Sequence, residues 1–243
     1  MNLKHYKRSL NASIRDANMI FAVSEHSKND LVRNFDIPEN KIHVTYQSVQ
    51  IPEQYKQIDT HALSDFLDRQ FNLKQKEYFL LYGAIEPKKN VARILEAFAI
   101  AKTDYPILIV GKDGWLHADV DAFFRQQDAL KRGKINNRFI RVPHMSSHSL
   151  MHLIKGARGL VFPWLYEGFG LPVLEAMEMG CPVITSHVSA LPEVGGDAVH
   201  YVDPYDVSDI AAAIDRFAAD DAYTASLVAK GSAQAKRFSS ERY

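Results

Sequence analysis

Two glutamates flank a glycine-containing loop in the middle of the second half of the chain. Glu167 lies in this loop with Gly168 and Gly170, and Glu175 lies about one turn into a helix that Pro172 is suited to begin. The free N–H groups and the positive dipole end of a helix start favour a phosphate, and glycines allow it to approach the backbone. Carboxylates repel phosphate, so accepting hydrogen bonds from sugar hydroxyls is their natural role. The sequence therefore predicts a site for a ligand that carries both phosphate and sugar.

The elements around this loop alternate between strand and helix. Such alternation predicts an α/β fold, with a Rossmann-like parallel sheet covered by helices on both faces. Ligands bind at the carboxyl ends of such strands, so the loops after Tyr82, Val110, Val142 and Phe162 should share one rim. Strands are expected at 19–23, 41–46, 78–82, 106–110, 139–142, 159–162, 183–185 and 199–202, and helices at 4–18, 25–34, 62–71, 91–102, 118–131, 147–155, 171–179, 207–218 and 223–237.

Composition limits the classes of partner. Lys+Arg and Asp+Glu number 29 each among 243 residues, so the whole-chain charge gives no argument for nucleic acid or an acidic membrane. The single cysteine, Cys181, is interpreted as a core residue of a protein from a reducing compartment. The first residues are polar and basic, and no apolar run is long enough to cross a bilayer. We expect a cytoplasmic protein whose membrane contact is at most peripheral, at the inner face.

Four blocks carry a resemblance to a known family. They are FPWLYEGFGLPVLEAMEMGCPVITS with its Glu-x7-Glu spacing, SALPEVGGDAVHYVDPYD, YGAIEPKKN and VSEHSKNDLVRNFDIPENKIHVTYQSV. Together they closely resemble the "glycosyl transferases group 1" family of retaining glycosyltransferases with the two-domain GT-B fold. The resemblance covers nearly the whole chain in order, and it is nearest to mannosyltransferases of polysaccharide and O-antigen assembly. It implies an enzyme that transfers a hexose from a nucleotide diphosphate sugar to a glycan or lipid-linked acceptor.

The resemblance also assigns roles to residues. Glu175 would bind the ribose hydroxyls, Glu167 would contact the transferred sugar, and Lys89 with Lys88 would neutralise the diphosphate as the glycosidic bond breaks. The alternative for each is a solvated helix-start or loop charge, and for the glycines a plain tight turn. Further donor-binding residues by the same resemblance are Gly83, Val142, Pro143, His144, Gly168, Phe169, Gly170 and Leu171.

Some features depart from the family or remain open. Ala84 stands where many members carry an arginine, which leaves the cationic role to Lys88 and Lys89. The loop from Ser189 to Glu193 is expected to support Glu175 or cap the base, and Trp164 and Tyr166 to pack in the core and at the rim. No Asp-x-Asp motif and no metal-like histidine spacing occur, so neither a metal nor a cofactor is expected.

The resemblance predicts three parts of the chain. Residues 1–50 match the end of an acceptor domain, 51–76 a linker and first helix, and 77–243 a donor domain. The chain is thus interpreted as a piece of a longer enzyme or one half of a split one, with an acceptor-domain chain as a possible partner. Three hypotheses stay open: a transferase favouring GDP-mannose and then UDP-hexoses, a donor-binding module without turnover, and an unrelated dinucleotide enzyme. The last is weak, since no G-x-G-x-x-G opens a βαβ unit.

Overall fold

A six-stranded parallel sheet forms the centre of the larger part of the molecule. The computed structural model describes residues 3–130, 138–142 and 144–239. Strand order in the sheet is β5-β4-β3-β6-β7-β8, and every neighbouring pair is parallel. The strands are β3 (Phe79–Tyr82), β4 (Ile107–Val110), β5 (Phe139–Val142), β6 (Gly159–Phe162), β7 (Val183–Ser186) and β8 (His200–Val202). The predicted α/β fold class is confirmed.

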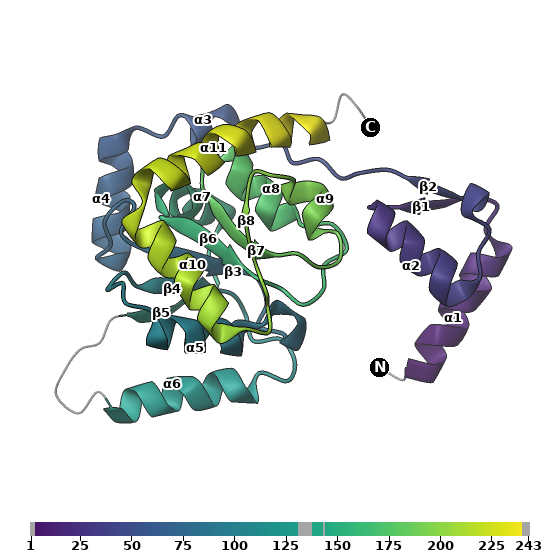
Figure 1. Cartoon of the computed structure of the whole chain (residues 1–243), viewed down its shortest axis with the longest axis horizontal. Helices are drawn as coiled ribbons and strands as arrows, with labels where there is room; N and C mark the ends of the chain where they lie inside the picture. Colours follow the sequence, from purple (N-terminus) through teal and green to yellow (C-terminus); the bar gives the residue numbers. More distant parts are fainter. Residues whose placement is uncertain (1–2, 131–137, 143, 240–243) are drawn as a thin grey trace.

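Apolar side chains point to both faces of this sheet because both faces are covered by helices. In β3, Leu80 and Tyr82 belong to one buried cluster, while Phe79 and Leu81 belong to another. Figure 1 shows the helices on either side. The first cluster includes residues of α4 (Thr60–Phe71), α7 (Ser147–Gly156), α8 (Leu171–Glu178) and α9 (Leu191–Gly195), and the second includes residues of α5 (Val91–Ile100), α6 (Ala118–Leu130), α10 (Val207–Ala219) and α11 (Asp221–Ala235).

The strand order reverses between β3 and β6, which pair at Phe79 with Gly159 and Leu80 with Leu160. In open parallel sheets a crevice forms at the carboxyl ends of the two strands on either side of such a reversal. The loops after β3 and β6 are those that carry Lys88, Lys89 and Glu167. The topology therefore brings the two predicted charged loops to one place.

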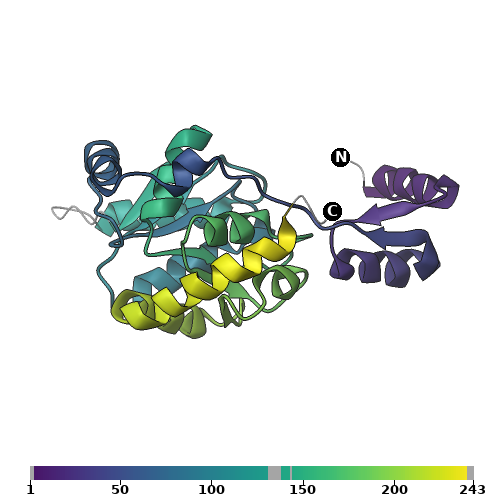
Figure 2. The ribbon, with the colours of Figure 1, turned by 90° about the horizontal axis from the view of Figure 1, so that it is seen from above.

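The N-terminal part makes a smaller unit of its own. It contains α1 (Leu3–Asp16), β1 (Ile20–Ala22), α2 (Glu25–Phe35), η1 (Glu39–Lys41) and β2 (Ile42–Val44), with β1 and β2 parallel. Ala22, Ile37 and Ile42 form its small core. Figure 2 shows the two helices on opposite sides of these strands, with an extended segment leading to the larger part.

Several elements differ from the sequence-based expectation. The segment expected to be an unstructured linker contains the short helix α3 (Glu53–Lys56), whose Lys56 ammonium lies 2.5 Å from the Glu178 carboxylate of α8. Residues 191–195 form the helix α9 instead of a loop. The final helix begins at Asp221 and gives way after Ala235 to the turn η3 (Lys236–Phe238). Lys131, the expected end of α6, lies outside the described residues.

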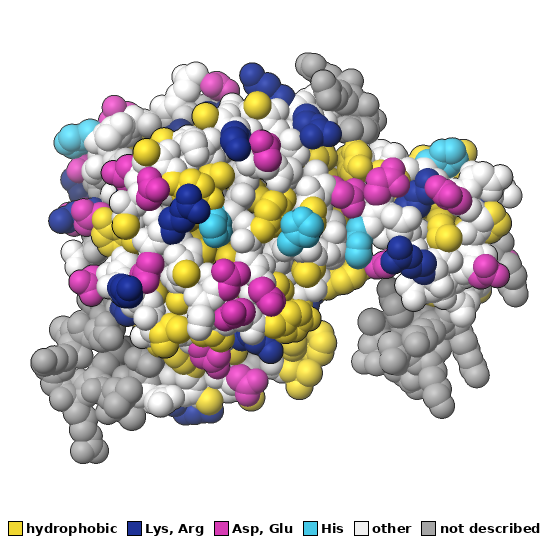
Figure 3. Space-filling model, viewed as in Figure 1, with side chains coloured by type: hydrophobic (Ala, Val, Ile, Leu, Met, Phe, Trp, Pro, Cys, Tyr) yellow, Lys and Arg dark blue, Asp and Glu magenta, His cyan; other side chains and the backbone are white. Residues whose placement is uncertain are grey.

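Charged side chains of both signs are interspersed on the face shown in Figure 3. This distribution agrees with the equal numbers of basic and acidic residues in the sequence. None of the described helices is sufficiently long and apolar to cross a membrane.

Candidate functional site

The loops that follow β3, β4 and β5 enclose a hollow of about 420 Å³ at the carboxyl edge of the sheet. Gly83 and His144, two of the residues predicted to bind the donor, line this hollow. Val142 ends β5, and its carbonyl accepts a hydrogen bond from Gly111 at 2.9 Å in the neighbouring loop. Pro143 lies outside the described residues. The full lining is Tyr82, Gly83, Ala84, Val110, Gly111, Lys112, His144, Met145, Ser147 and Leu150.

Glu167 lies where the loop after β6 faces the loop after β3. Its Oε2 is 4.0 Å from the Lys88 Nζ, and its backbone N–H donates to the Ser189 Oγ at 2.9 Å. The Leu165 N–H also donates to the Lys88 carbonyl at 2.8 Å, which joins the two loops. Burial raises the pKa of the Glu167 carboxyl, and Lys88, Lys89 and a hydrogen bond from the Phe169 N–H oppose this rise. The Glu167 carboxylate therefore lies among two lysine ammonium groups and a backbone N–H that favour its charged form.

Lys89 is a buried cation, with only 9% of its surface exposed. Its Nζ lies 4.6 Å above the centre of the Trp164 ring, and among the residues that the structure describes it donates no hydrogen bond and forms no ion pair. Burial lowers the pKa of this ammonium. Gly83 makes room for it: this residue has φ +122°, and a Cβ there would lie 2.6 Å from the Lys89 Nζ. The site therefore holds a positive charge that none of the described residues neutralises by direct contact.

Glu175 is held by a residue that the sequence analysis did not identify. The Tyr82 hydroxyl, from the end of β3, donates to the Glu175 Oε2 at 2.5 Å. Burial raises the pKa of the Glu175 carboxyl, and the hydrogen bond from Tyr82 opposes the rise. Tyr82 also lines the hollow, so it connects Glu175 to this cavity. The only available sequence signal was a tyrosine at the carboxyl end of a predicted strand.

The start of α8 has the form expected for a helix beginning at a ligand site. Gly170 caps the helix with φ +116°, Leu171 begins it, and Pro172 follows in the first turn. Phe169 is 2% exposed, and its ring packs against Tyr46. The Phe169 side chain is therefore part of the core, which leaves its backbone as the group able to face a ligand.

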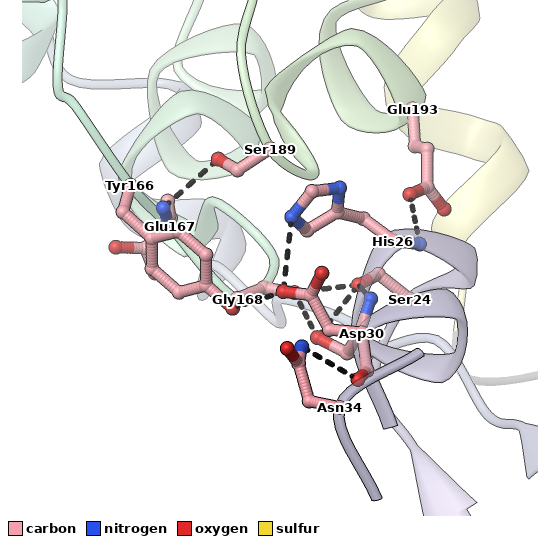
Figure 4. Close-up of polar contacts among 10 residues, drawn as sticks. Ser24, His26, Asp30, Asn34, Tyr166, Glu167, Gly168, Ser189 and Glu193 are labelled. Carbon is pink, nitrogen blue, oxygen red and sulfur yellow. Dashed lines mark hydrogen bonds and ion pairs between the residues drawn. The ribbon is translucent and has the colours of Figure 1, made fainter. Parts of the chain in front are cut away.

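In the hydrogen bonds of the described residues, the segment from Ser189 to Glu193 contacts Glu167 and α2 and not Glu175, while its role in capping the base stays a prediction. Ser189 accepts from the Glu167 backbone, and Glu193 accepts from the backbone N–H groups of Glu25 and His26 in α2. Figure 4 shows the contacts of Ser189 with Glu167 and of Glu193 with His26. Trp164 is buried and Tyr166 is half exposed, which confirms the expectation of core and rim packing.

One group of side chains outside this site has the chemistry of metal ligands. Possible ligand atoms of Asp113, His117 and Asp121 lie within 4.8 Å of one another. The Arg141 guanidinium is paired with the carboxylates of both Asp113 and Asp121. The single charge of Arg141 therefore already offsets part of the negative charge of these two carboxylates.

A model of the family "Glycosyl transferases group 1" matches residues 63–234. The chain belongs to this family. Its match includes both charged loops, the hollow and α8, so every predicted site residue lies within it. The expected family and the GT-B type of sheet are confirmed.

Among curated relatives, the chain is 33% identical over 98% of its length to O-antigen chain mannosyltransferase B of Escherichia coli and covers 61% of that protein. It is 28% identical over 83% of its length to O-antigen chain mannosyltransferase RfbU of Salmonella typhimurium and covers 51% of it. This family member therefore spans roughly half to three-fifths of the length of these two relatives.

Among solved structures, the fold is similar to that of Anabaena HepE crystallised with UDP and glucose. The TM-score is 0.83 with 18% sequence identity, over 98% of this chain and 63% of that one. WaaG, a glycosyltransferase involved in lipopolysaccharide biosynthesis, gives a TM-score of 0.72 with 16% identity, over 89% of this chain and 58% of that one. At these identities the likeness establishes the fold.

Proposed function

We propose that the chain supplies the donor-binding part of a retaining hexosyltransferase. The donor is a nucleotide diphosphate sugar, GDP-mannose in the first place and a UDP-hexose in the second. The acceptor is a hydroxyl of a glycan or of a lipid-linked saccharide at the inner face of the membrane. Family membership and relatives named as O-antigen mannosyltransferases support this proposal.

The observation that carries the proposal is the environment of the Lys89 ammonium. A buried charge without a partner costs free energy, and a diphosphate would supply the missing anion. Lys88 lies nearby on the same turn, and the positive dipole end of α8 begins in the facing loop. These groups would bind the leaving diphosphate more tightly as negative charge develops on it.

The two carboxylates have different roles in this proposal. Glu175, held by Tyr82 beside the hollow, accepts hydrogen bonds from the ribose hydroxyls, and the hollow takes the base. Glu167 orients the hexose and stabilises the positive charge that it acquires as the bond to the diphosphate breaks. The acceptor oxygen then attacks on the face that the diphosphate leaves and transfers its proton to a diphosphate oxygen. This step retains the anomeric configuration and uses neither a covalent glycosyl-enzyme nor a metal ion.

A second candidate is a donor-binding part that performs no turnover alone. The chain covers 61% of the length of the E. coli relative, so groups from a separate acceptor domain are needed in this alternative. Comparing hexose transfer by the chain alone with transfer after addition of the acceptor-domain half distinguishes the two. A trapped glycosyl-enzyme adduct would contradict the mechanism in either case.

Calorimetric titration of the purified chain with GDP, UDP, ADP and NAD tests the proposal. We expect one nucleoside diphosphate to bind with a Kd on the order of 1 μM. Glu175→Ala and Lys89→Ala should weaken it, while Asp59→Ala, a cap of the distant helix α4, should not. If a folded chain binds NAD and no diphosphate nucleotide, the proposal is wrong.

A further inference from the structure

Two hydroxyls from α2 hold a carbonyl of the donor-site loop. The Ser24 Oγ donates to the Gly168 carbonyl at 2.7 Å, and the Ser27 Oγ lies 3.2 Å from the same oxygen. Ser24 is fully buried and also caps α2 by accepting from the Ser27 N–H. Figure 4 shows Ser24 beside Gly168. A carbonyl of the loop that carries Glu167 is thus tied to the N-terminal part of the chain.

The peptide unit that contains the Gly168 carbonyl also acts on the Glu167 carboxylate. The Gly168 carbonyl and the Phe169 N–H belong to one peptide, and this N–H acts on the Glu167 carboxyl, whose pKa it lowers by stabilising the charged form. A trans peptide is planar, so its C=O and N–H point in opposite directions. Fixing the carbonyl on α2 therefore fixes the N–H that orients the carboxylate. Hydrogen bonds joined through a peptide also polarise and strengthen one another.

Other contacts fix the position of α2 relative to the loop that carries Glu167. The Glu193 carboxylate accepts from the N–H groups of Glu25 at 2.8 Å and His26 at 2.7 Å. On the outer side of α2, the Tyr166 hydroxyl donates to the Asp30 carboxylate at 2.8 Å. These contacts hold both the start of α2 and its Asp30 beside the loop of residues 166–168. They therefore fix the position of the two serine hydroxyls relative to the Gly168 carbonyl.

We propose that Ser24 and Ser27 are positioning residues that orient the Glu167 carboxylate through the Gly168–Phe169 peptide. The N-terminal part of the chain then determines whether the group facing the transferred hexose is correctly placed. The role of Glu167 toward the hexose rests on the function proposed above. The orientation itself depends only on the hydrogen bonds described here.

Carboxyl titration by ¹³C NMR on glutamate-labelled protein tests the orientation directly. Glu167→Gln assigns the Glu167 signal, and the Glu175 signal serves as an internal reference. With Ser24 and Ser27 both replaced by alanine, the pKa of Glu167 should rise, because the Phe169 N–H no longer stabilises its charged form. Lys88, Lys89 and Glu86, the other charges that act on this carboxyl, are unchanged in the variant.

Matched variants separate positioning from loss of stability. Ser27→Ala removes one donor and leaves the Ser24 cap intact, whereas Asp59→Ala removes a cap of similar strength from α4, about 1 kcal/mol. We expect Ser27→Ala to raise the Glu167 pKa in part and Ser27→Thr to restore it. Asp59→Ala should lower the melting temperature without moving the Glu167 signal. The Glu175 signal should be constant throughout.

A binding measurement supplies the second readout. If the wild type binds nucleotide, the double alanine variant should lose about tenfold in affinity for the intact nucleotide sugar and keep its affinity for the nucleoside diphosphate. An unchanged Glu167 pKa in the double variant overturns the proposal whatever the binding result. A wild type that binds no nucleotide contradicts the proposed function instead, and the titration still decides the positioning role.

Discussion

The unpaired ammonium of Lys89 is the residue-scale feature that best separates a binding site from a structural turn. Burial lowers its pKa, and only the Trp164 ring and more distant charges act on it. Charged side chains in protein interiors are normally paired because desolvation is costly. A chain selected for stability alone would have no reason to keep this arrangement.

Replacing this lysine should therefore improve stability while it harms binding. We expect Lys89→Met to have a melting temperature equal to or above that of the wild type, since it removes a charge that burial destabilises. Its affinity for a nucleoside diphosphate should fall at least about tenfold. Lys88→Met, at a half-exposed position, is the matched control and should lose less affinity. A clear loss of stability in Lys89→Met would contradict this account.

The partly buried Glu175 gives the stability of the protein a predictable pH dependence. The folded-state pKa of Glu175 is above the ordinary value of 4.5. Its contribution to stability is therefore present in full below the unfolded-state pKa and is lost as pH rises through the folded-state pKa. We expect Glu175→Gln to be more stable than the wild type at pH 7. Denaturant unfolding between pH 4 and pH 8 should show this difference disappear toward the acid end.

The hydrogen bond between Tyr82 and Glu175 could not be predicted from the sequence. Glu167, Glu175, Lys88 and Lys89 stand in recognisable motifs, and the structure places them around one rim. Tyr82 is the last residue of an apolar strand, a position that also suits a core residue. Its hydroxyl reaches Glu175 across 93 positions of sequence, and no local pattern specifies such a contact.

Among elements, α8 depends on the backbone conformation of the glycine that precedes it. Gly170 has φ +116°, and a Cβ there would lie 3.2 Å from the Leu191 side chain. We expect Gly170→Ala to cost about 1–3 kcal/mol of stability, because other residues rarely adopt this conformation. Gly168→Ala is the control: its added Cβ would meet nothing closer than 3.9 Å, and it should change stability by about 0.5 kcal/mol or less. Equal losses in chemical denaturation would contradict this explanation.

Most helices and strands were predictable from the sequence, but the short helices α3 and α9 were not. The central strands are apolar on both faces and appear in the sequence as short uninterrupted apolar runs bounded by turn residues. The helices α3 and α9 have four and five residues, too few for a hydrophobic period to be visible. Tertiary contacts help to place them, such as those of Lys56 with Glu178 and of Glu193 with α2.

At the scale of the whole molecule, Glu193 connects the small N-terminal part with the large sheet. Its carboxylate accepts from two backbone N–H groups at the start of α2 and from the Tyr46 hydroxyl at 3.2 Å. Helix N-termini favour negative charge, so one side chain stabilises the helix and its placement together. The contacts span more than 140 positions of sequence, which explains why no sequence pattern indicated them.

Removing the Glu193 carboxylate should destabilise the N-terminal part of the chain and leave the six-stranded sheet unchanged. We expect Glu193→Ala to speed backbone hydrogen exchange in residues 20–44, while the six-stranded sheet keeps its protection. Asp197→Ala provides the control, because its ion pair with Lys230 lies on the surface at the far end of α9. Unchanged exchange in α2 would show that Glu193 does not hold the two parts together.

The central position of β3 also matters while the chain is being made. Its partner β4 follows after one helix, but Gly159 and Leu160, which pair with Phe79 and Leu80, leave the ribosome only after β5 and α7. Until then a nascent chain presents an apolar strand with one open edge, which can pair with other chains. Translation arrested before residue 159 should therefore yield chains that aggregate or recruit chaperones. Arrest after β6 should bury this strand.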